Sequence, residues 1–132
     1  QGIKENLIDV IVSDHLPEDE ESKRLPFAQA ATGAIGIETL LPLALEMYHN
    51  ESLPLNKIIE TITINPSKIL KINKGSLKKG ADGDICIFDL EAPWKLDAEK
   101  LKSKSKNTAI EERKLQGKVL MTFLNGELVF NH

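Results

Sequence analysis

The sequence is poor in several features that would narrow its class. It has one cysteine in 132 residues, so no disulfide can form within the chain. Aromatic residues make up 5%, so the core has to be mainly aliphatic. No apolar run approaches the roughly 20 residues of a membrane-spanning helix, and no signal-peptide pattern opens the chain. We therefore expect a soluble protein of a reducing compartment, the cytoplasm, with no membrane partner.

Basic residues are also in the minority, with 17 Lys and Arg against 20 Asp and Glu and a net charge of -3. Binding to phosphates needs a basic surface, so we expect no nucleic-acid partner. Hydrophobic residues (41%) and charged residues (28%) are present in ordinary globular proportions. The chain begins at Gln1 and runs directly into a strand-like segment, so we expect a fragment of a longer protein.

The apolar pattern changes near residues 72–76. Before that point, a strand-like segment is followed by helix-like segments, which is typical of an α/β fold. These are a buried strand over 8–12, a long loop over 16–32, and helices over 37–49, over 54–63 and from 65 onward. Asn65 is the expected N-cap of the last helix, with Pro66 as its first residue.

After that point, glycine-flanked turns and short apolar runs predict a small all-β part. The expected strands cover 84–88, 94–96, 118–124 and 127–130. Asn125 and Gly126 separate the last two strands and suit a two-residue hairpin turn, in which both residues need a positive φ. We expect Cys86 to be a small buried hydrophobe. The Lys-rich stretch 95–106 is expected to be a solvated loop or helix instead of a binding site.

Asp14 is the first candidate for chemistry because it directly follows the first predicted strand. The carboxyl ends of strands are where α/β barrels hold their catalytic groups. Asp is also a common turn former or helix cap, and that structural role stays open. The acidic run 18–21 could bind a metal, although charge runs on loops are usually only solvated. The three histidines are scattered and lack the spacing of a metal site within the chain.

Several segments, taken together and in order, resemble one family. The segments are VSDHLP at 12–17, TGAIGIETLLPL at 32–43, TINPSKIL at 63–70, GSLKKGADGDI at 75–85, GKV at 117–119 and NGELV at 125–129. They are similar to the C-terminal part of class I dihydroorotases, in the amidohydrolase superfamily. The first two are the more specific to dihydroorotases, whereas NPSKIL and the glycine-rich segment are shared widely by cyclic amide hydrolases.

The resemblance implies a fold. The chain would be the C-terminal fragment of a metal-dependent hydrolase with an α/β architecture, a (β/α)8 TIM barrel followed by strands of a small composite β-sandwich. Residues 1–73 would form the end of the barrel, with its last strand, active-site loop and helices. Residues 74–132 would form the C-terminal part of the β-sandwich.

The resemblance also implies zinc-dependent, reversible hydrolysis of the cyclic amide of dihydroorotate to N-carbamoyl-L-aspartate, in pyrimidine biosynthesis. Asp14 would bind zinc and carry a proton between the hydroxide and the leaving ring nitrogen, with the other ligands upstream. Thr32 and Gly33 match the position where the family's backbone holds the substrate ring, although Thr32 is not the usual residue. Glu18 stands where the family usually has a histidine that binds the substrate carboxylate, and an ionised glutamate offers only acceptors.

The departure at Glu18 leaves alternatives open. Arg24 or an upstream arginine could hold the substrate carboxylate, or the substrate could be that of an allantoinase or dihydropyrimidinase. The chain could also belong to a non-catalytic dihydroorotase-like subunit that scaffolds aspartate transcarbamoylase. The expected partners are therefore a small-molecule substrate and a second copy or aspartate transcarbamoylase. We expect no activity from the isolated chain, because one carboxylate does not supply the three protein ligands of a catalytic zinc.

Overall fold

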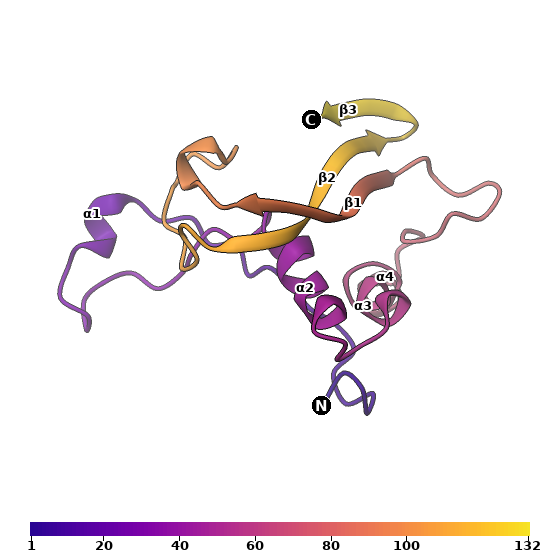
Figure 1. Cartoon of the computed structure of the whole chain (residues 1–132), viewed down its shortest axis with the longest axis horizontal. Helices are drawn as coiled ribbons and strands as arrows, with labels where there is room; N and C mark the ends of the chain where they lie inside the picture. Colours follow the sequence, from indigo (N-terminus) through magenta and orange to yellow (C-terminus); the bar gives the residue numbers. More distant parts are fainter.

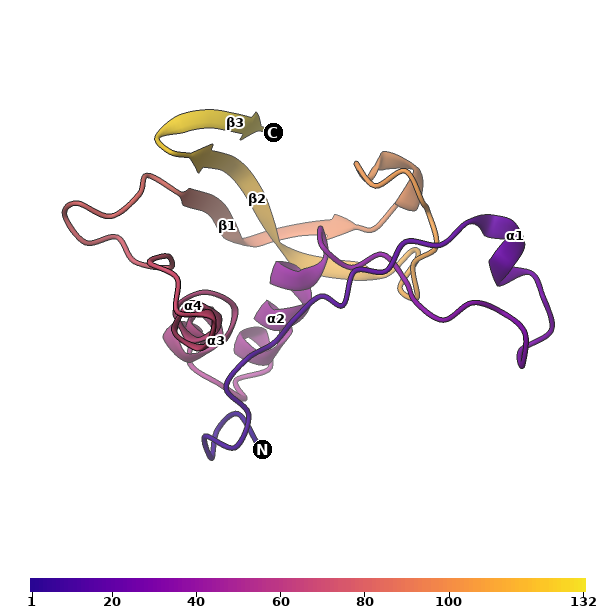
Figure 2. The same cartoon turned by 180° about the vertical axis from the view of Figure 1, so that it is seen from behind.

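The computed structural model describes all residues, 1–132. The helices are α1 (Glu20–Lys23), α2 (Leu40–His49), α3 (Leu55–Ile62) and α4 (Ile64–Leu70). The strands are β1 (Ile85–Lys95), β2 (Lys114–Leu124) and β3 (Glu127–Asn131), with a 3-10 turn, η1 (Ala98–Lys100), after β1. The strands form a long β-ribbon, with α2, α3 and α4 on one side of it and α1 out beyond one end of it (Figure 1). Figure 2 shows α3 and α4 beside α2. The loop that carries α1 extends away from the molecule on the side opposite to α3 and α4. No helix is both long and apolar enough to cross a membrane.

The three strands form one antiparallel sheet in the order β1-β2-β3. β1 pairs with β2 from Ile85, opposite Phe123, to Lys95, opposite Lys114, with an irregularity between Asp89 and Pro93. Proline lacks the N–H of a ladder bond, so it is confined to edge strands and bulges, and β1 is an edge strand. The two short strands predicted over 84–88 and 94–96 are therefore one strand with an irregular middle.

The turn between β2 and β3 has the predicted geometry. Asn125 has a φ of 53° and Gly126 a φ of 83°, which confirms the two-residue hairpin. The Gly126 N–H donates to the Gly83 carbonyl at 2.9 Å, and the Asn125 N–H donates to the Asp84 carboxylate at 2.9 Å. These bonds tie the start of β1 to the hairpin.

The core forms where α2 packs against β2 on one side and α3 on the other. Leu45 of α2 and Ile58 of α3 are fully buried, and Leu115 of β2 is 4% exposed. Gly117 lies directly under α2, since a Cβ at this position would be 2.4 Å from the Leu45 Cδ1 atom. Gly117 also has a φ of 93°, so the backbone requires glycine here, while a Cβ would in addition force the Leu45 side chain to shift.

Residues 8–12, predicted as a buried strand, are not paired as a strand in this chain. The Ile11 N–H of this segment donates to the Thr61 carbonyl at 3.1 Å, and Val12 is 71% exposed. A strand needs a neighbouring strand to complete its hydrogen bonds, and this chain places none beside the segment. The segment is extended but unpartnered.

Two local predictions are wrong. Cys86 is exposed, because its face of the ribbon carries no covering layer in this chain. Asn65 does not cap a helix, because α4 already begins at Ile64 and has no side-chain cap. The Asn65 side chain instead donates to the carbonyl of Asp9 at 2.9 Å and so ties α4 to the extended N-terminal segment.

Candidate active site

Asp14 lies at a sharp bend in the backbone. Its φ of 45° is in the left-handed region, which Asp tolerates better than most residues. The residues after it are anchored, because His15 forms a parallel bridge with Ala34 and the Leu16 N–H donates to the Ala34 carbonyl at 3.0 Å. The Asp14 carboxylate is exposed, makes no hydrogen bond or ion pair and caps no helix. It is therefore available to a ligand.

His15 ties this bend to the segment that precedes α2. Its Nδ1 atom accepts the N–H of Gly36 at 3.1 Å and that of Ile37 at 3.3 Å. The two segments approach closely, since a Cβ on Gly36 would lie 2.6 Å from the carbonyl oxygen of Ser13. Gly36, the second glycine of the TGAIG segment, thus lets the two backbones run side by side.

Gly33 lies against the backbone on the other side of the bend. Its φ is 113°, and a Cβ would lie 2.8 Å from the Leu16 carbonyl oxygen, so no other residue fits without a shift. Lys23 reaches over from α1, and its Nζ donates to the carbonyls of Ala31 at 2.7 Å and Gly33 at 2.9 Å. Thr32, between these two carbonyls, is exposed and its side chain makes no hydrogen bond.

Glu18 is held through its backbone and not through its carboxylate. Its N–H donates to the Asn107 Oδ1 atom at 3.4 Å, and its carbonyl accepts the Ser105 hydroxyl at 2.6 Å. The Glu18 carboxylate itself makes no hydrogen bond or ion pair. Ser105 and Asn107 were missed by the sequence analysis, which predicted a solvated loop or helix over 95–106 and singled out nothing at Asn107. The available signal was small, namely that Ser and Asn side chains readily bond to backbone groups.

The acidic run before and within α1 has structural roles. Asp19 caps α1 by accepting the Ser22 N–H at 2.8 Å, and this bond lowers the pKa of the Asp19 carboxyl. Arg24 forms exposed ion pairs with Glu20 at 3.3 Å and Glu21 at 3.1 Å. Its charge is therefore engaged within its own helix, and no contact brings it to Glu18. No group of three or more acidic, His or Cys side chains in the chain is arranged to hold a metal ion.

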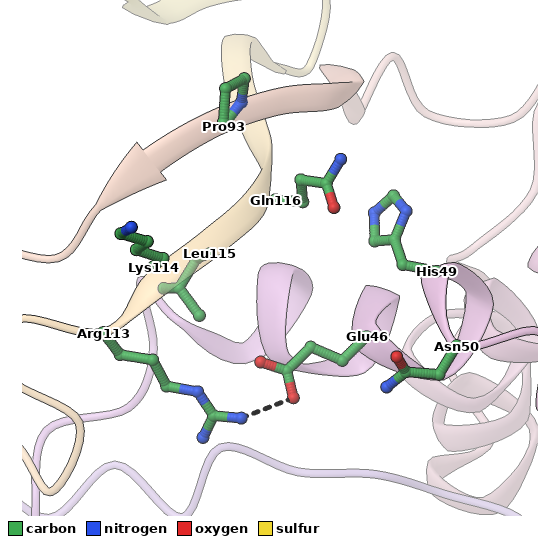
Figure 3. A pocket seen from close by; sticks show the side chains of 8 residues that line it. All are labelled: Glu46, His49, Asn50, Pro93, Arg113, Lys114, Leu115 and Gln116. Carbon is green, nitrogen blue, oxygen red and sulfur yellow. Dashed lines mark hydrogen bonds and ion pairs between the residues drawn. The ribbon is translucent and has the colours of Figure 1, made fainter.

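A polar pocket lies elsewhere, between the end of α2 and the β-ribbon (Figure 3). Its volume is about 430 Å³. Figure 3 shows Arg113 extending toward Glu46, to which it donates at 2.8 Å. The ring of His49 also faces this pocket, with its Nδ1 3.9 Å from the Glu91 carboxylate and its Nε2 buried without a partner. None of the predicted site residues lines this pocket. The pocket is therefore separate from the segment that holds those residues, 13–36, here called the Asp14 loop.

Comparison with known families decides where the chain belongs. The profile described as the amidohydrolase family matches residues 1–129. The chain belongs to the amidohydrolase family. Amidohydrolase relatives named dihydroorotase include proteins from Ehrlichia chaffeensis and Acetivibrio thermocellus, each 42% identical over 130 residues, or 98% of this chain. The one from Anaplasma phagocytophilum is 41% identical over 129 residues. These matches confirm the predicted resemblance to dihydroorotases.

The chain spans only part of each relative. It covers 29% of the Ehrlichia chaffeensis and Anaplasma phagocytophilum proteins and 30% of the Acetivibrio thermocellus protein. The chain likewise matches only part of each solved structure that it resembles. L-hydantoinase (dihydropyrimidinase) from Arthrobacter aurescens matches 98% of this chain and 30% of its own, with a TM-score of 0.91 and 30% identity. Dihydropyrimidinase from Brevibacillus agri matches the same shares, with a TM-score of 0.92 and 21% identity, which shows a shared fold alone.

Proposed function

We propose that this amidohydrolase chain is part of a cytoplasmic dihydroorotase, which reversibly hydrolyses the cyclic amide of dihydroorotate to N-carbamoyl-L-aspartate in pyrimidine biosynthesis. The observation that carries the proposal is the 42% identity to proteins named dihydroorotase across 98% of the chain. That coverage takes in the whole Asp14 loop. The anchored backbone around an unpartnered carboxylate adds a structural reason, because a catalytic group needs a fixed position and a free side chain.

We propose Asp14 as the residue of this chain that holds zinc and moves the proton. A carboxylate oxygen is an accepted zinc ligand, and that of Asp14 is exposed and unpaired. Zinc, when bound, lowers the pKa of its water toward about 7. Asp14 then accepts a proton from the attacking water and delivers it to the ring nitrogen that leaves. The remaining ligands have to come from outside these residues, since the chain offers no other converging donors.

We propose that the substrate ring lies against the backbone of Thr32 and Gly33, where the missing side chain of Gly33 permits close approach. Glu18 lies in the same loop, and its carboxylate can only accept hydrogen bonds. The negative carboxylate of dihydroorotate therefore needs a donor elsewhere. Because Arg24 is engaged by Glu20 and Glu21, we favour a basic group outside this chain.

The same proposal extends to the fold. Residues 1–73 would close a (β/α)8 TIM barrel, with residues 8–12 as its last strand, and 74–132 would contribute to a small composite β-sandwich. Leu7 is 75% exposed and Val12 71%, as expected of a segment whose neighbouring strands lie outside the chain. An apolar groove of about 310 Å³ runs beside residues 11–13 and the start of α2 and would be filled by the barrel core.

A second candidate is another cyclic amide hydrolase, because the L-hydantoinase structure is 30% identical to this chain. A substrate panel on the intact, zinc-loaded protein separates the two, with dihydroorotate, dihydrouracil, hydantoin and allantoin compared under the same conditions. We expect turnover of dihydroorotate above all the others. Preference for a ring without a carboxylate would support the second candidate. Absence of all turnover, with co-purification of aspartate transcarbamoylase, would instead support a non-catalytic scaffold.

A further inference from the structure

The segment 101–107, here called the clasp, connects the β-ribbon to the Asp14 loop. Near its start, the Glu38 carboxylate accepts the N–H groups of Lys102 at 3.0 Å and Ser103 at 3.1 Å. At its end, the Asn107 carbonyl accepts the N–H of Ile35 at 3.0 Å. Both ends of the clasp are thus bonded to residues just before α2. The Lys-rich stretch is therefore partly a contact surface for the loop.

Within the clasp, the Asn107 carboxamide joins two distant positions of the loop. Its Nδ2 donates to the Gly33 carbonyl at 3.2 Å, while its Oδ1 accepts the Glu18 N–H at 3.4 Å. The Ser105 hydroxyl adds a bond to the Glu18 carbonyl at 2.6 Å. The planar carboxamide of asparagine has both an NH2 donor and a carbonyl acceptor. It can therefore bond the Gly33 carbonyl and the Glu18 N–H at the same time.

The bridge also fixes a backbone donor. The Gly33 carbonyl receives two donors, Asn107 Nδ2 and the Lys23 Nζ at 2.9 Å. Because the peptide unit is planar, fixing this carbonyl also fixes the direction of the Ala34 N–H in the same unit. That N–H makes no hydrogen bond within the chain. The clasp therefore orients an unpaired donor next to Gly33.

We propose that Asn107 is a positioning residue, which fixes the backbone of Glu18 and Gly33 so that Gly33 and the unpaired Ala34 N–H are held where the substrate ring lies. This inference rests on the proposed function and deepens it, because it assigns part of substrate binding to a segment 74 residues beyond Gly33. A residue of this kind acts on binding of the substrate more than on the chemical step, since it touches neither zinc nor the reacting bond.

The test uses the intact, zinc-loaded protein and dihydroorotate. Asn107→Ala is expected to raise KM about tenfold, the effect of about 1.4 kcal/mol of lost binding, while kcat changes by less than about threefold. Asn107→Asp keeps an acceptor for the Glu18 N–H but loses the donor to Gly33, and it is expected to raise KM as well. Lys100→Ala is the matched control, because Lys100 lies just before the clasp, is 83% exposed and pairs with Asp97 alone.

Hydrogen exchange gives a readout that does not depend on activity. In Asn107→Ala the Glu18 amide loses its acceptor and should exchange faster, whereas Lys100→Ala should leave it unchanged. Faster exchange with an unchanged KM would show a purely structural contact and overturn the proposal, as would unchanged exchange. If Asn107→Ala fails to fold, Ser105→Ala removes the hydroxyl that contacts both the Glu18 carbonyl and the Asn107 Oδ1 atom, and it is judged by the same criteria. If the wild type does not turn over dihydroorotate, the proposed function fails and the positioning role fails with it, while the exchange data still show whether Asn107 bonds the Glu18 amide.

Discussion

The Asp14 loop and the α2–β2 contact are stabilised by different physical means. The loop is held by polar side chains that bond to backbone groups, such as His15, Lys23 and Asn107. The α2–β2 contact is formed by aliphatic side chains, with Leu45 fully buried and Leu115 nearly so. Directional hydrogen bonds fix positions but contribute modestly to stability, whereas burial of apolar area contributes most of it. Substitutions in the two regions should therefore affect different measurements.

Asp14→Asn gives the largest expected effect and should separate activity from stability. The amide of asparagine cannot accept the proton, so we expect kcat for dihydroorotate to fall by about 10³-fold or more. The Asp14 side chain is exposed and unpaired, so the melting temperature should remain that of the wild type. Steady-state kinetics and thermal unfolding of the same intact preparation measure both. Activity close to wild type would remove Asp14 from the mechanism.

Leu45→Ala tests the α2–β2 contact, where stability should change. The side chain is fully buried against Gly117 of β2, so its truncation leaves a cavity and should cost about 2 to 5 kcal/mol of unfolding free energy. Leu124→Ala is the matched control, because Leu124 is 52% exposed and should cost much less. Urea unfolding followed by circular dichroism measures both variants. Equal costs for the two substitutions would contradict the packing of α2 on β2.

Glu18→His tests specificity within the loop. Histidine can donate to the substrate carboxylate where glutamate can only accept, so we expect KM for dihydroorotate to fall by up to about tenfold. The Glu18 backbone bonds to Ser105 and Asn107 do not involve the replaced side chain, so stability should hardly change. Kinetics with dihydroorotate and with dihydrouracil provide the measurement. An equal change for both substrates would show that position 18 does not contact the carboxylate.

The smallest expected effect concerns an ionic contact far from both regions. The Asn125 N–H and, next, the Lys74 ammonium at 2.5 Å hold the pKa of the Asp84 carboxyl below its ordinary value of 3.8. This lowering stabilises the protein fully above the unfolded pKa, and the stabilisation is lost as the pH falls through the lowered pKa of the folded state. Asp84→Asn should therefore be less stable than wild type at pH 7, and the difference should shrink as the pH falls below 3.8. A difference that persists at low pH would show that charge is not the cause.

Several local features followed from short stretches of sequence. Asn125 and Gly126 predicted the hairpin because both residues reach positive φ at low cost. The helices expected over 37–49 and 54–63 are present over Leu40–His49 and Leu55–Ile62, since the apolar spacing reflects a face that is buried. The bridge between His15 and Ala34, which brings the segments of Asp14 and Gly33 together, has no local signal, because no local pattern links residues so far apart.

Contacts between distant segments account for what the sequence analysis missed. Cys86 and residues 8–12 were expected to be buried, but burial depends on whether another layer covers them, and in this chain none does. Asn107 directly follows the stretch that was expected to be solvated, and its bonds to Glu18 and Gly33 span 89 and 74 residues. Backbone propensities act over a few residues and were enough for the turns, the helices and the apolar character of the ribbon. The geometry around Asp14 depends on the packing of α2, the clasp and the loop, because hydrogen bonds between distant backbones exist only after the chain has folded.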